Sequence, residues 1–411
     1  MVELKFNDYI ELKYKYTGEF HEGLAIVKNN EDEFGFIDKK GKEVIKCKYH
    51  DVKNFSEGLA AVQNDKNLWG YINQQGEEII PCKYLNAKDF SEGLAVVKTN
   101  LGNYVYIDKN DIQIIGYEYT FASSFFEGYA LVKHKGSNLY NYLDKNSHHN
   151  GRYLSATSFQ NGKAIVMDDE YIYIIDKSFQ PKFLKKLNRE SISKAILCNN
   201  GYTLIVDDNG YYGFLNTDFE KITPISFLNA REFHQENAIV EISNDFIGFI
   251  NDGGKITAFS KYHQYKEIND FSEGLAAVQN VEGLWGYINP EGKEVIPCQF
   301  KQADNFSEGL AGVMDKEGSI YYIDKKGKKI ISIDKVYYSS IELLDKTITI
   351  KANSPQELAA EKLRVISLAK YEIIAATINM IDQIAYTESS GLYKPQTRKR
   401  TNKKGNKKKE N

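Results

Sequence analysis

The stretch from Phe55 to Tyr84, FSEGLAAVQNDKNLWGYINQQGEEIIPCKY, decides the fold, because it returns nearly intact from Phe271 to Phe300 as FSEGLAAVQNVEGLWGYINPEGKEVIPCQF. The same pattern recurs outward from this stretch, with register marks at Phe20, Phe55, Phe90, Phe125, Phe159, Cys198, Phe233, Phe271 and Phe306. The gaps between these marks are 35, 35, 35, 34, 39, 35, 38 and 35 residues. A nearly fixed period of this size indicates one supersecondary unit copied along the chain.

Each unit carries the signals of antiparallel strands joined by short turns. Ser56-Glu57-Gly58 predicts a turn in which the glycine supplies a positive φ. Residues 59–63 and 69–72 follow as two strands, and Asn73 with a glycine three residues later predicts the next turn. Residues 77–84 form the third strand, so each unit is predicted to be a three-stranded meander whose connection ends at the next Phe. A unit this small buries too little apolar surface to be stable alone, so neighbouring units must stack.

The dipeptides Trp69-Gly70 and Trp285-Gly286 fall between the EGLA turn and the Asx turn. On this composite pattern the chain resembles a WG-repeat protein over about residues 20–329, and the resemblance implies a repeat protein of a mostly bacterial family. Some copies depart from the pattern. Phe34-Gly35, Tyr212-Gly213 and Ile247-Gly248 keep only the glycine, while Tyr104-Val105, Asn141 and Ile174 lose it.

The predicted architecture is an all-β array of about nine three-stranded units, stacked as an open β-solenoid or superhelix. Propeller blades usually have four strands and propellers usually stop at eight blades, so a closed β-propeller-like ring is the alternative. The predicted domains are residues 1–19 as a partial N-terminal repeat or cap, 20–352 as the array, 353–386 as an amphipathic helix and 387–411 as a disordered basic tail.

The helix is predicted from a change of periodicity after the array. Ser354-Pro355-Gln356-Glu357 reads as a capping box with proline at the first helical position. One broad apolar face gathers Leu363, Ile366, Ile373, Ile374, Met380, Ile381 and Ile384. Either this face packs on the last repeats as a cap, or it pairs with another helix, in a homo-oligomer or in a different protein.

The tail divides the charge of the chain unevenly. From residue 387 onward there are nine Lys or Arg and two Glu, a net charge of +7, so the rest carries −10 of the total of −3. Phosphate contacts by such a tail would be strongly salt-dependent and blind to sequence; a solubilising tail is the alternative. The candidate nucleic-acid contacts are Arg398, Lys399, Arg400, Lys403, Lys404, Lys407, Lys408 and Lys409.

Catalytic and cofactor motifs are not found in the sequence. It contains neither a Gly-rich phosphate loop nor a Gly-x-Ser-x-Gly elbow, and its seven histidines form no metal-ligating pair with a carboxylate. We therefore expect no catalytic, cofactor or metal site. The turn acids, Glu22, Glu57, Glu92, Glu127, Glu273 and Glu308, are interpreted as local backbone hydrogen-bonding groups or a solvated edge.

The compartment is predicted from the chain start and the cysteines. MVELKFNDYIELKYKY has no apolar run, so it is not a secretory signal, and no stretch is long and apolar enough to span a membrane. Cys47, Cys82 and Cys298 occupy one equivalent position in three repeats, which favours small buried hydrophobes rather than disulfides. A reducing cytoplasm fits this use of cysteine.

The function expected from these observations is a non-enzymatic scaffold that binds another protein along stacked repeats. One alternative is association with nucleic acid through the basic tail. The other is binding of carbohydrate or a small ligand by the repeat aromatics Trp69, Tyr104, Tyr212 and Trp285, if these rings face outward rather than pack in the core.

Overall fold

The computed structural model describes residues 7–366 and residue 368, apart from 170, 180–186, 189–191, 199–200, 219, 334, 344–345 and 353–355. The chain divides into two compact units. One is Leu12–Asp334, and the other joins Met1–Glu11 to Lys335–Asn411. The first unit contains the repeats and the second contains a separate small sheet, and each is described by itself.

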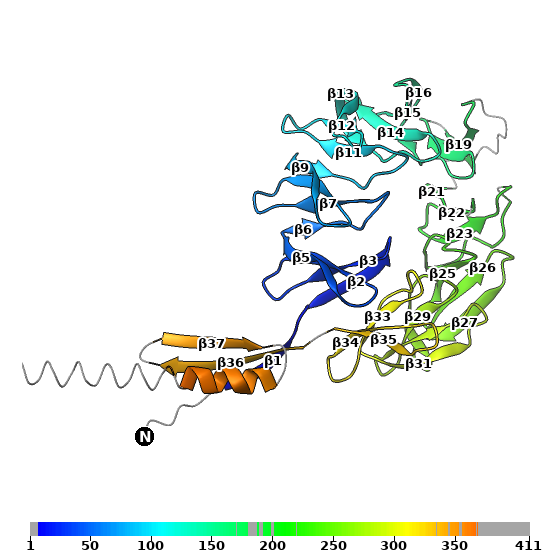
Figure 1. The fold of residues 1–411 in the computed structure, drawn as a ribbon. Helices are drawn as coiled ribbons and strands as arrows, with labels where there is room; N and C mark the ends of the chain where they lie inside the picture. The colour runs from blue at the N-terminus through cyan, green and yellow to red at the C-terminus, as the bar shows by residue number, and fades with distance from the viewer. Residues whose placement is uncertain are drawn as a thin grey trace, which may run out of the picture. The chain divides into compact units, whose positions relative to one another are not determined.

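Nine repeats follow one another through the first unit as antiparallel sheets, and repeats 3 and 4 share one sheet of seven strands (Figure 1). Repeats 1 to 3 contain β2 (Tyr16–His21), β3 (Leu24–Lys28), β4 (Phe34–Asp38) and β5 (Glu43–Tyr49); β6 (Asp51–Val52), β7 (Leu59–Gln63), β8 (Trp69–Asn73) and β9 (Glu78–Tyr84); and β10 (Asn86–Ala87), β11 (Ala95–Lys98), β12 (Tyr104–Ile107) and β13 (Gln113–Ala122). Repeats 4 to 6 contain the end of β13 with β14 (Tyr129–His134), β15 (Tyr140–Asp144) and β16 (His149–Tyr153); β17 (Ser155–Ala156), β18 (Lys163–Met167), β19 (Tyr171–Asp176) and β20 (Leu187–Asn188); and β21 (Lys194–Leu197), β22 (Thr203–Val206) and β23 (Tyr212–Leu215). Repeats 7 to 9 contain β24 (Asn229–Ala230), β25 (Asn237–Ser243), β26 (Phe246–Asn251) and β27 (Ile256–Ser260); β28 (Tyr265–Ile268), β29 (Ala276–Asn280), β30 (Trp285–Ile288) and β31 (Glu294–Phe300); and β32 (Gln302–Ala303), β33 (Ala311–Met314), β34 (Ile320–Ile323) and β35 (Lys329–Ser332).

The all-β repeat class and the copied unit are confirmed, but the prediction of three strands per repeat missed a strand. The connection before each register Phe pairs with the next strand, as when Asp51 and Val52 of β6 lie opposite Gln63 and Val62 of β7. A typical sheet therefore has four strands in the order β6-β7-β8-β9. A two-residue strand is too short to show the alternation from which strands are predicted.

Each sheet is buried on both faces between its neighbours. On β7, Leu59 and Ala61 join the core shared with repeat 3, whereas Ala60 and Val62 join the core shared with repeat 1. This two-sided burial explains why the LAAV segment is continuously apolar instead of alternating with polar residues. A register Phe lies in every core but the one between repeats 5 and 6, since repeat 6 has Cys198 at that position. Phe90, for example, packs its ring edge-on against Tyr71 of the preceding repeat, with ring centroids 4.9 Å apart.

The first and last repeats are joined in the same way as consecutive repeats. An open row of nine units has eight junctions, but nine core clusters each combine two adjacent repeats, and one of these combines repeat 9 with repeat 1. At that junction the hydroxyl of Tyr322 donates to the Gly18 carbonyl at 2.7 Å, just as Tyr106 donates to Ser123 at 2.8 Å between repeats 3 and 4. The hydroxyl of Ser307 likewise donates to the Phe20 carbonyl.

These contacts favour the closed, ring-like alternative over the open superhelical stack that the sequence analysis placed first. The fourth strand removes one argument against a ring, because four strands are typical of a propeller blade. Among the described repeats, closure also covers the two outer sheet faces that an open array would expose at its ends.

The glycine of the WG pair is required because the outermost strand crosses close above it. The register between β8 and β9 shifts so that Trp69 pairs with Tyr84 while Tyr71 pairs with Ile80, and the extra residues of β9 form a bulge over Gly70. A Cβ at Gly70 would lie 2.4 Å from the Ile80 carbonyl oxygen and 2.7 Å from the Cys82 nitrogen. No side chain fits in that space.

Two copies that lose this glycine carry one on the facing strand. Val105 pairs directly with Gly116 of β13. In repeat 4, the Asn141 side chain donates to the carbonyl of Gly151, which has φ +69°. The close approach of the two strands therefore persists in these repeats, with the glycine transferred to the partner strand.

The second unit contains a three-stranded sheet in the order β1 (Asn7–Leu12), β36 (Lys335–Leu343) and β37 (Lys346–Ala352). A helix at residues 356–366 covers it, with Leu358 buried beside Ile350 and Ala352. Residues 7–12, predicted to belong to a partial N-terminal repeat or cap, and residues 335–343 and 346–352, predicted to belong to the array, thus form one separate sheet. The capping residues Ser354 and Pro355 lie outside the described residues.

We expect Gly70→Ala to lower the free energy of unfolding by about 2–3 kcal/mol, because the new methyl group clashes with rigid backbone. The measurement is the denaturant midpoint at unchanged slope. Gly253→Ala is the control, since its Cβ would meet only the Asn251 side chain at 3.5 Å. Equal midpoints for the two variants would contradict the close approach of β9.

Ring closure predicts that Tyr322→Phe costs as much stability as Tyr106→Phe. Each change leaves one carbonyl at a repeat junction without its donor, which costs about 1–2 kcal/mol. Denaturant unfolding of the two variants beside the wild type measures both losses. In an open array, Tyr322 has no partner repeat, so a loss seen for Tyr106→Phe alone would refute closure.

Candidate functional site

The predicted site residues lie mostly outside the described part of the chain. All eight basic tail residues, Arg398 to Lys409, and five helix residues, Ile373, Ile374, Met380, Ile381 and Ile384, fall there. Of the two helix residues that are described, Leu363 is 67% exposed and Ile366 is half-buried. Leu358 and Val365, which the sequence analysis did not name, make the helix contact with the sheet. Leu358 and Val365 are seven residues apart, or two helical turns, and this spacing could have identified them as one face of the helix.

The turn acids join neighbouring repeats. Glu57 adopts φ +53° in a two-residue hairpin turn, and its carboxylate accepts from the Gly93 amide at 3.0 Å. The ammonium of Lys109 binds the carbonyl and the carboxylate of the same Glu57. Glu308 makes the equivalent bonds to Gly23 and Lys39 across the junction between repeats 9 and 1. The sequence predicted that these acids bond to the backbone of their own turn. Instead, each carboxylate accepts a hydrogen bond from a glycine amide of the next repeat.

The aromatic residues at the WG position are largely part of the core. Trp69 is 7% exposed and packs in the cluster between repeats 2 and 3, and Trp285 is partly buried between repeats 8 and 9. A ring enclosed in this way presents no open face to a sugar. These positions therefore give no support to carbohydrate binding by stacking.

The cysteines are free thiols at inter-strand positions. Cys82 and Cys298 each donate to a backbone carbonyl of the same repeat, at 3.7 and 3.8 Å. Burial raises the pKa of the Cys82 thiol to about 11 and that of Cys298 to about 12, so both are protonated and unreactive near neutral pH. In the described part of the chain, no group of three His, Cys, Asp or Glu side chains is arranged to hold a metal ion.

Exposed aliphatic side chains recur at one position of the outermost strand. They precede the buried Ile of β5, β9, β13, β31 and β35, and side chains alternate along a strand, so they face outward. Their exposed fractions run from 37% to 48%. We call this set the outer stripe: Val44, Ile79, Ile114, Val295 and Ile330. Because repeat 9 adjoins repeat 1, the stripe runs over five consecutive repeats, 8, 9, 1, 2 and 3.

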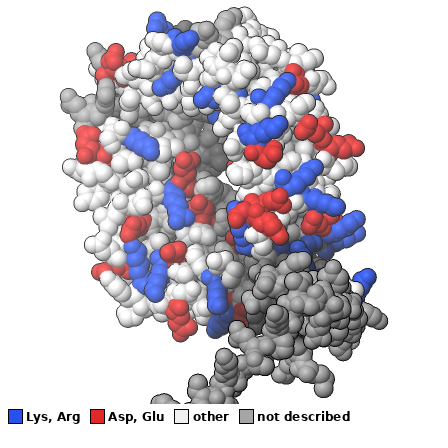
Figure 2. Space-filling model, turned by 90° about the vertical axis from the view of Figure 1, so that its left-hand side faces the viewer, with Lys and Arg blue, Asp and Glu red and all other residues white. Residues whose placement is uncertain are grey.

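Charges of both signs are interspersed on the face seen in Figure 2, where Lys and Arg alternate with Asp and Glu. No single-sign area dominates this face. Such a surface does not steer a highly charged partner, so apolar contacts are the more distinctive feature of the repeats.

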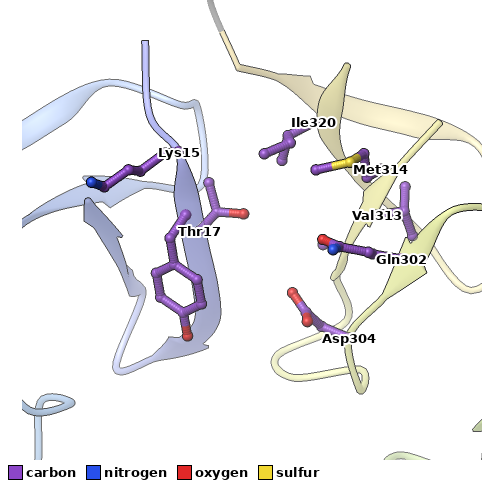
Figure 3. A pocket seen from close by; sticks show the side chains of 9 residues that line it. Lys15, Thr17, Gln302, Asp304, Val313, Met314 and Ile320 are labelled. Carbon is purple, nitrogen blue, oxygen red and sulfur yellow. The ribbon is translucent and has the colours of Figure 1, made fainter. Parts of the chain in front are cut away.

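A cavity lies at the junction between repeats 9 and 1 (Figure 3). It has a volume of about 90 Å³. Val313, Met314 and Ile320 form its apolar wall. Gln302 and Asp304 lie on the same side, in repeat 9, and point toward Thr17 of repeat 1 across the cavity.

The cavity exists because two repeat residues are smaller at this junction. Ile320 occupies the position of Trp69, as its pairing with Met314 shows, and Gly312 occupies the position of Ala61. A second cavity of about 90 Å³ lies between repeats 5 and 6, where Ile172 holds the same position. The glycine position of repeat 5 is therefore occupied by Tyr173, one residue before the Ile174 that the sequence pattern indicated. Thus both cavities occur where isoleucine replaces the aromatic ring of the motif.

Asp304 is the ionisable group most affected by this environment. Burial raises the pKa of its carboxyl to about 7, and the nearby Glu19 carboxylate contributes to the increase. A Cβ built on Gly312 would lie 2.6 Å from Oδ2 of Asp304 and 3.6 Å from the hydroxyl oxygen of Thr17. Both oxygens therefore lie close to the Gly312 backbone, in space that the absence of a side chain leaves open.

The fold and its junctions define a β-repeat protein. The chain belongs to the WG-repeat family, since the model of the WG containing repeat matches residues 10–31, 34–67, 69–104, 106–137, 247–284 and 285–318. The intervening residues 138–246 contain the repeats in which the motif is most altered. No helix among the described residues is long and apolar enough to cross a membrane.

A search of the curated proteins finds no match. Among solved structures, the chain is similar to BamB from Moraxella catarrhalis, at 12% identity and a TM-score of 0.36 over 77% of this chain and 95% of that one. It is also similar to AztD from Citrobacter koseri, at 10% identity and a TM-score of 0.35 over 81% and 98%. At such low TM-scores, neither topology nor function is transferred from these proteins.

Asp304→Asn should gain stability relative to the wild type as pH rises from 5 to 8. The folded pKa lies above the unfolded value, so stability is full below about pH 4 and is lost as pH rises toward 7, whereas Asn does not titrate. We expect a relative gain of about 2–3 kcal/mol, measured by denaturant unfolding across pH. The exposed Asp65→Asn is the control. Parallel pH curves for Asp304→Asn and the wild type would refute the assignment.

Proposed function

We propose that this protein is a non-enzymatic scaffold that binds another protein through the outer stripe. The observation that carries the proposal is the recurrence of exposed aliphatic residues at one position in five consecutive repeats. Single exposed aliphatic residues are common on any surface. A regular row of them on a rigid array is a typical feature of an interaction site.

The chemistry of the stripe favours side-chain packing over strand addition. β9 and β31 are sheet edges, but each contains a bulge and an exposed proline, Pro81 or Pro297. Both features block a further strand from pairing. The partner therefore packs apolar side chains against Val44, Ile79 and Ile114 and their equivalents, without extending the sheet.

The compartment and the lack of catalysis are parts of the same proposal. Four free cysteines are compatible with a cytoplasmic protein. Binding of nucleic acid through the basic tail stays a prediction, since the tail residues lie outside the described part of the chain.

The proposal predicts that Val44→Lys/Ile79→Lys/Ile114→Lys abolishes capture of specific protein partners by the full chain. Three buried contacts would each be replaced by a charge that resists desolvation, so partner binding should fall at least tenfold. The measurement is quantitative affinity capture with nuclease treatment, which removes material bound through nucleic acid. Thermal unfolding confirms that the variant folds.

The matched control is Leu101→Lys/Leu154→Lys/Leu228→Lys, which adds the same charge at three exposed leucines outside the stripe. It should retain the partners of the wild type. Partners that bind all three proteins equally would exclude the stripe as their site. Turnover of any small substrate by the purified chain would contradict a non-enzymatic role.

A further inference from the structure

The cavities at the two equivalent junctions differ in charge. Between repeats 9 and 1 the lining includes Asp304 and Tyr16, whereas between repeats 5 and 6 the same two positions hold Thr157 and Lys194. The volumes are equal, at about 90 Å³ each. One of these two cavities therefore contains a carboxylate, and the other contains an ammonium group. The second cavity is a control of equal volume for ligand binding by the first.

The Asp304 carboxylate has no counterion in the described part of the chain. Its backbone groups are satisfied, since the carbonyl accepts from the Tyr287 hydroxyl at 2.7 Å and the amide donates to Gly312 at 2.9 Å. No hydrogen bond or ion pair joins its side chain to another described residue. Lys15 is the one lining residue with a cationic side chain, but its ammonium binds Asp32 and points away from the cavity.

An unpaired carboxylate in a confined, partly apolar space is unfavourable, and a bound cation would offset its cost. The nearby Glu19 carboxylate increases the negative potential at Asp304. This electrostatic environment disfavours anions such as phosphate. Too few oxygen ligands converge there to replace the water shell of a metal ion, because no cluster of three acidic or metal-ligating side chains occurs among the described residues.

The volume and the apolar wall define the rest of the ligand. About 90 Å³ is the space of roughly three water molecules, which suits a group of four or five heavy atoms. We infer that this cavity binds a primary ammonium group on a short alkyl stem, either a free small amine or the side chain of a lysine. The ammonium donates to the Asp304 carboxylate and to the oxygens of Thr17 and Gln302. The stem packs on Met314 and Ile320.

This inference is independent of the outer stripe. The stripe lies on the outermost strands, whereas the cavity is lined by the first three strands of repeat 9 and the first strand of repeat 1. Loss of one binding activity therefore need not affect the other.

The test uses n-propylammonium chloride and the full chain at pH 8, where Asp304 is ionised. Binding is followed by ligand-observed NMR, and a Kd on the order of millimolar is expected for so small a ligand. Propanol and propionate, which share the stem but lack the cation, should not bind. Nα-acetyl-lysine methylamide tests the second source: if it competes with propylammonium, a lysine side chain can occupy the cavity, and if it does not, the ligand is a free amine.

Two variants and one matched control connect binding to the cavity. Asp304→Asn should weaken propylammonium binding at least tenfold, and Ile320→Trp, which restores the ring of the motif, should abolish it. Ile172→Trp fills the other cavity and should leave binding unchanged. If Ile320→Trp does not fold, Gly312→Ala replaces it, because the new methyl group displaces the Asp304 carboxylate and alanine already occupies the equivalent positions 61 and 277.

The inference is overturned if the wild type does not bind propylammonium. It is equally overturned if Asp304→Asn and the filled-cavity variant bind as well as the wild type. Binding that is lost in Ile172→Trp alone would assign the ligand to the junction between repeats 5 and 6 and would also refute the inference.

Discussion

Burial of both faces of the repeat sheets is the constraint on which the rest of the first unit depends. A repeat has no core of its own: its strands are covered only when a neighbour lies on each side, as Ala60 and Ala61 of β7 are by repeats 1 and 3. Stability is therefore a property of junctions rather than of repeats. In an open array, two sheets would each leave one face exposed. The core shared by repeats 9 and 1 removes both exposed faces at once.

The sequence predicted the copied unit, its register and its turns, because these depend on local chemistry that recurs. It kept closure only as the alternative, because the residues that join repeat 9 to repeat 1 are those that join any two neighbours. Tyr322 carries the same signature as Tyr106, and only the position of its acceptor, Gly18, distinguishes a ring from a row. The fourth strand was missed for a different reason, since two residues contain no periodicity.

The repeats tolerate loss of the motif glycine and loss of the motif tryptophan in different ways. The glycine meets a backbone constraint, so Val105 and Asn141 are accompanied by Gly116 and Gly151 on the facing strands. The tryptophan fills space, and its replacement by Ile320 or Ile172 is not accompanied by a larger neighbour that fills the gap. An overlap with backbone cannot be relieved by a change of rotamer, so it destabilises the repeat unless a facing glycine makes room, whereas an unfilled cavity costs only part of the packing energy.

This difference explains why the candidate site is at a junction and why the sequence analysis did not find it. The turn acids, the WG pair and the register Phe are shared by the repeats and therefore report the fold. The cavity arises from departures, Ile320 and Gly312, which in a single repeat look like ordinary divergence. Its polar groups face one another only when closure brings Thr17 opposite Asp304, two residues that are separated by most of the array in sequence. A site built from both ends of a repeat array depends on closure, so a ligand bound there would stabilise the junction that completes the ring.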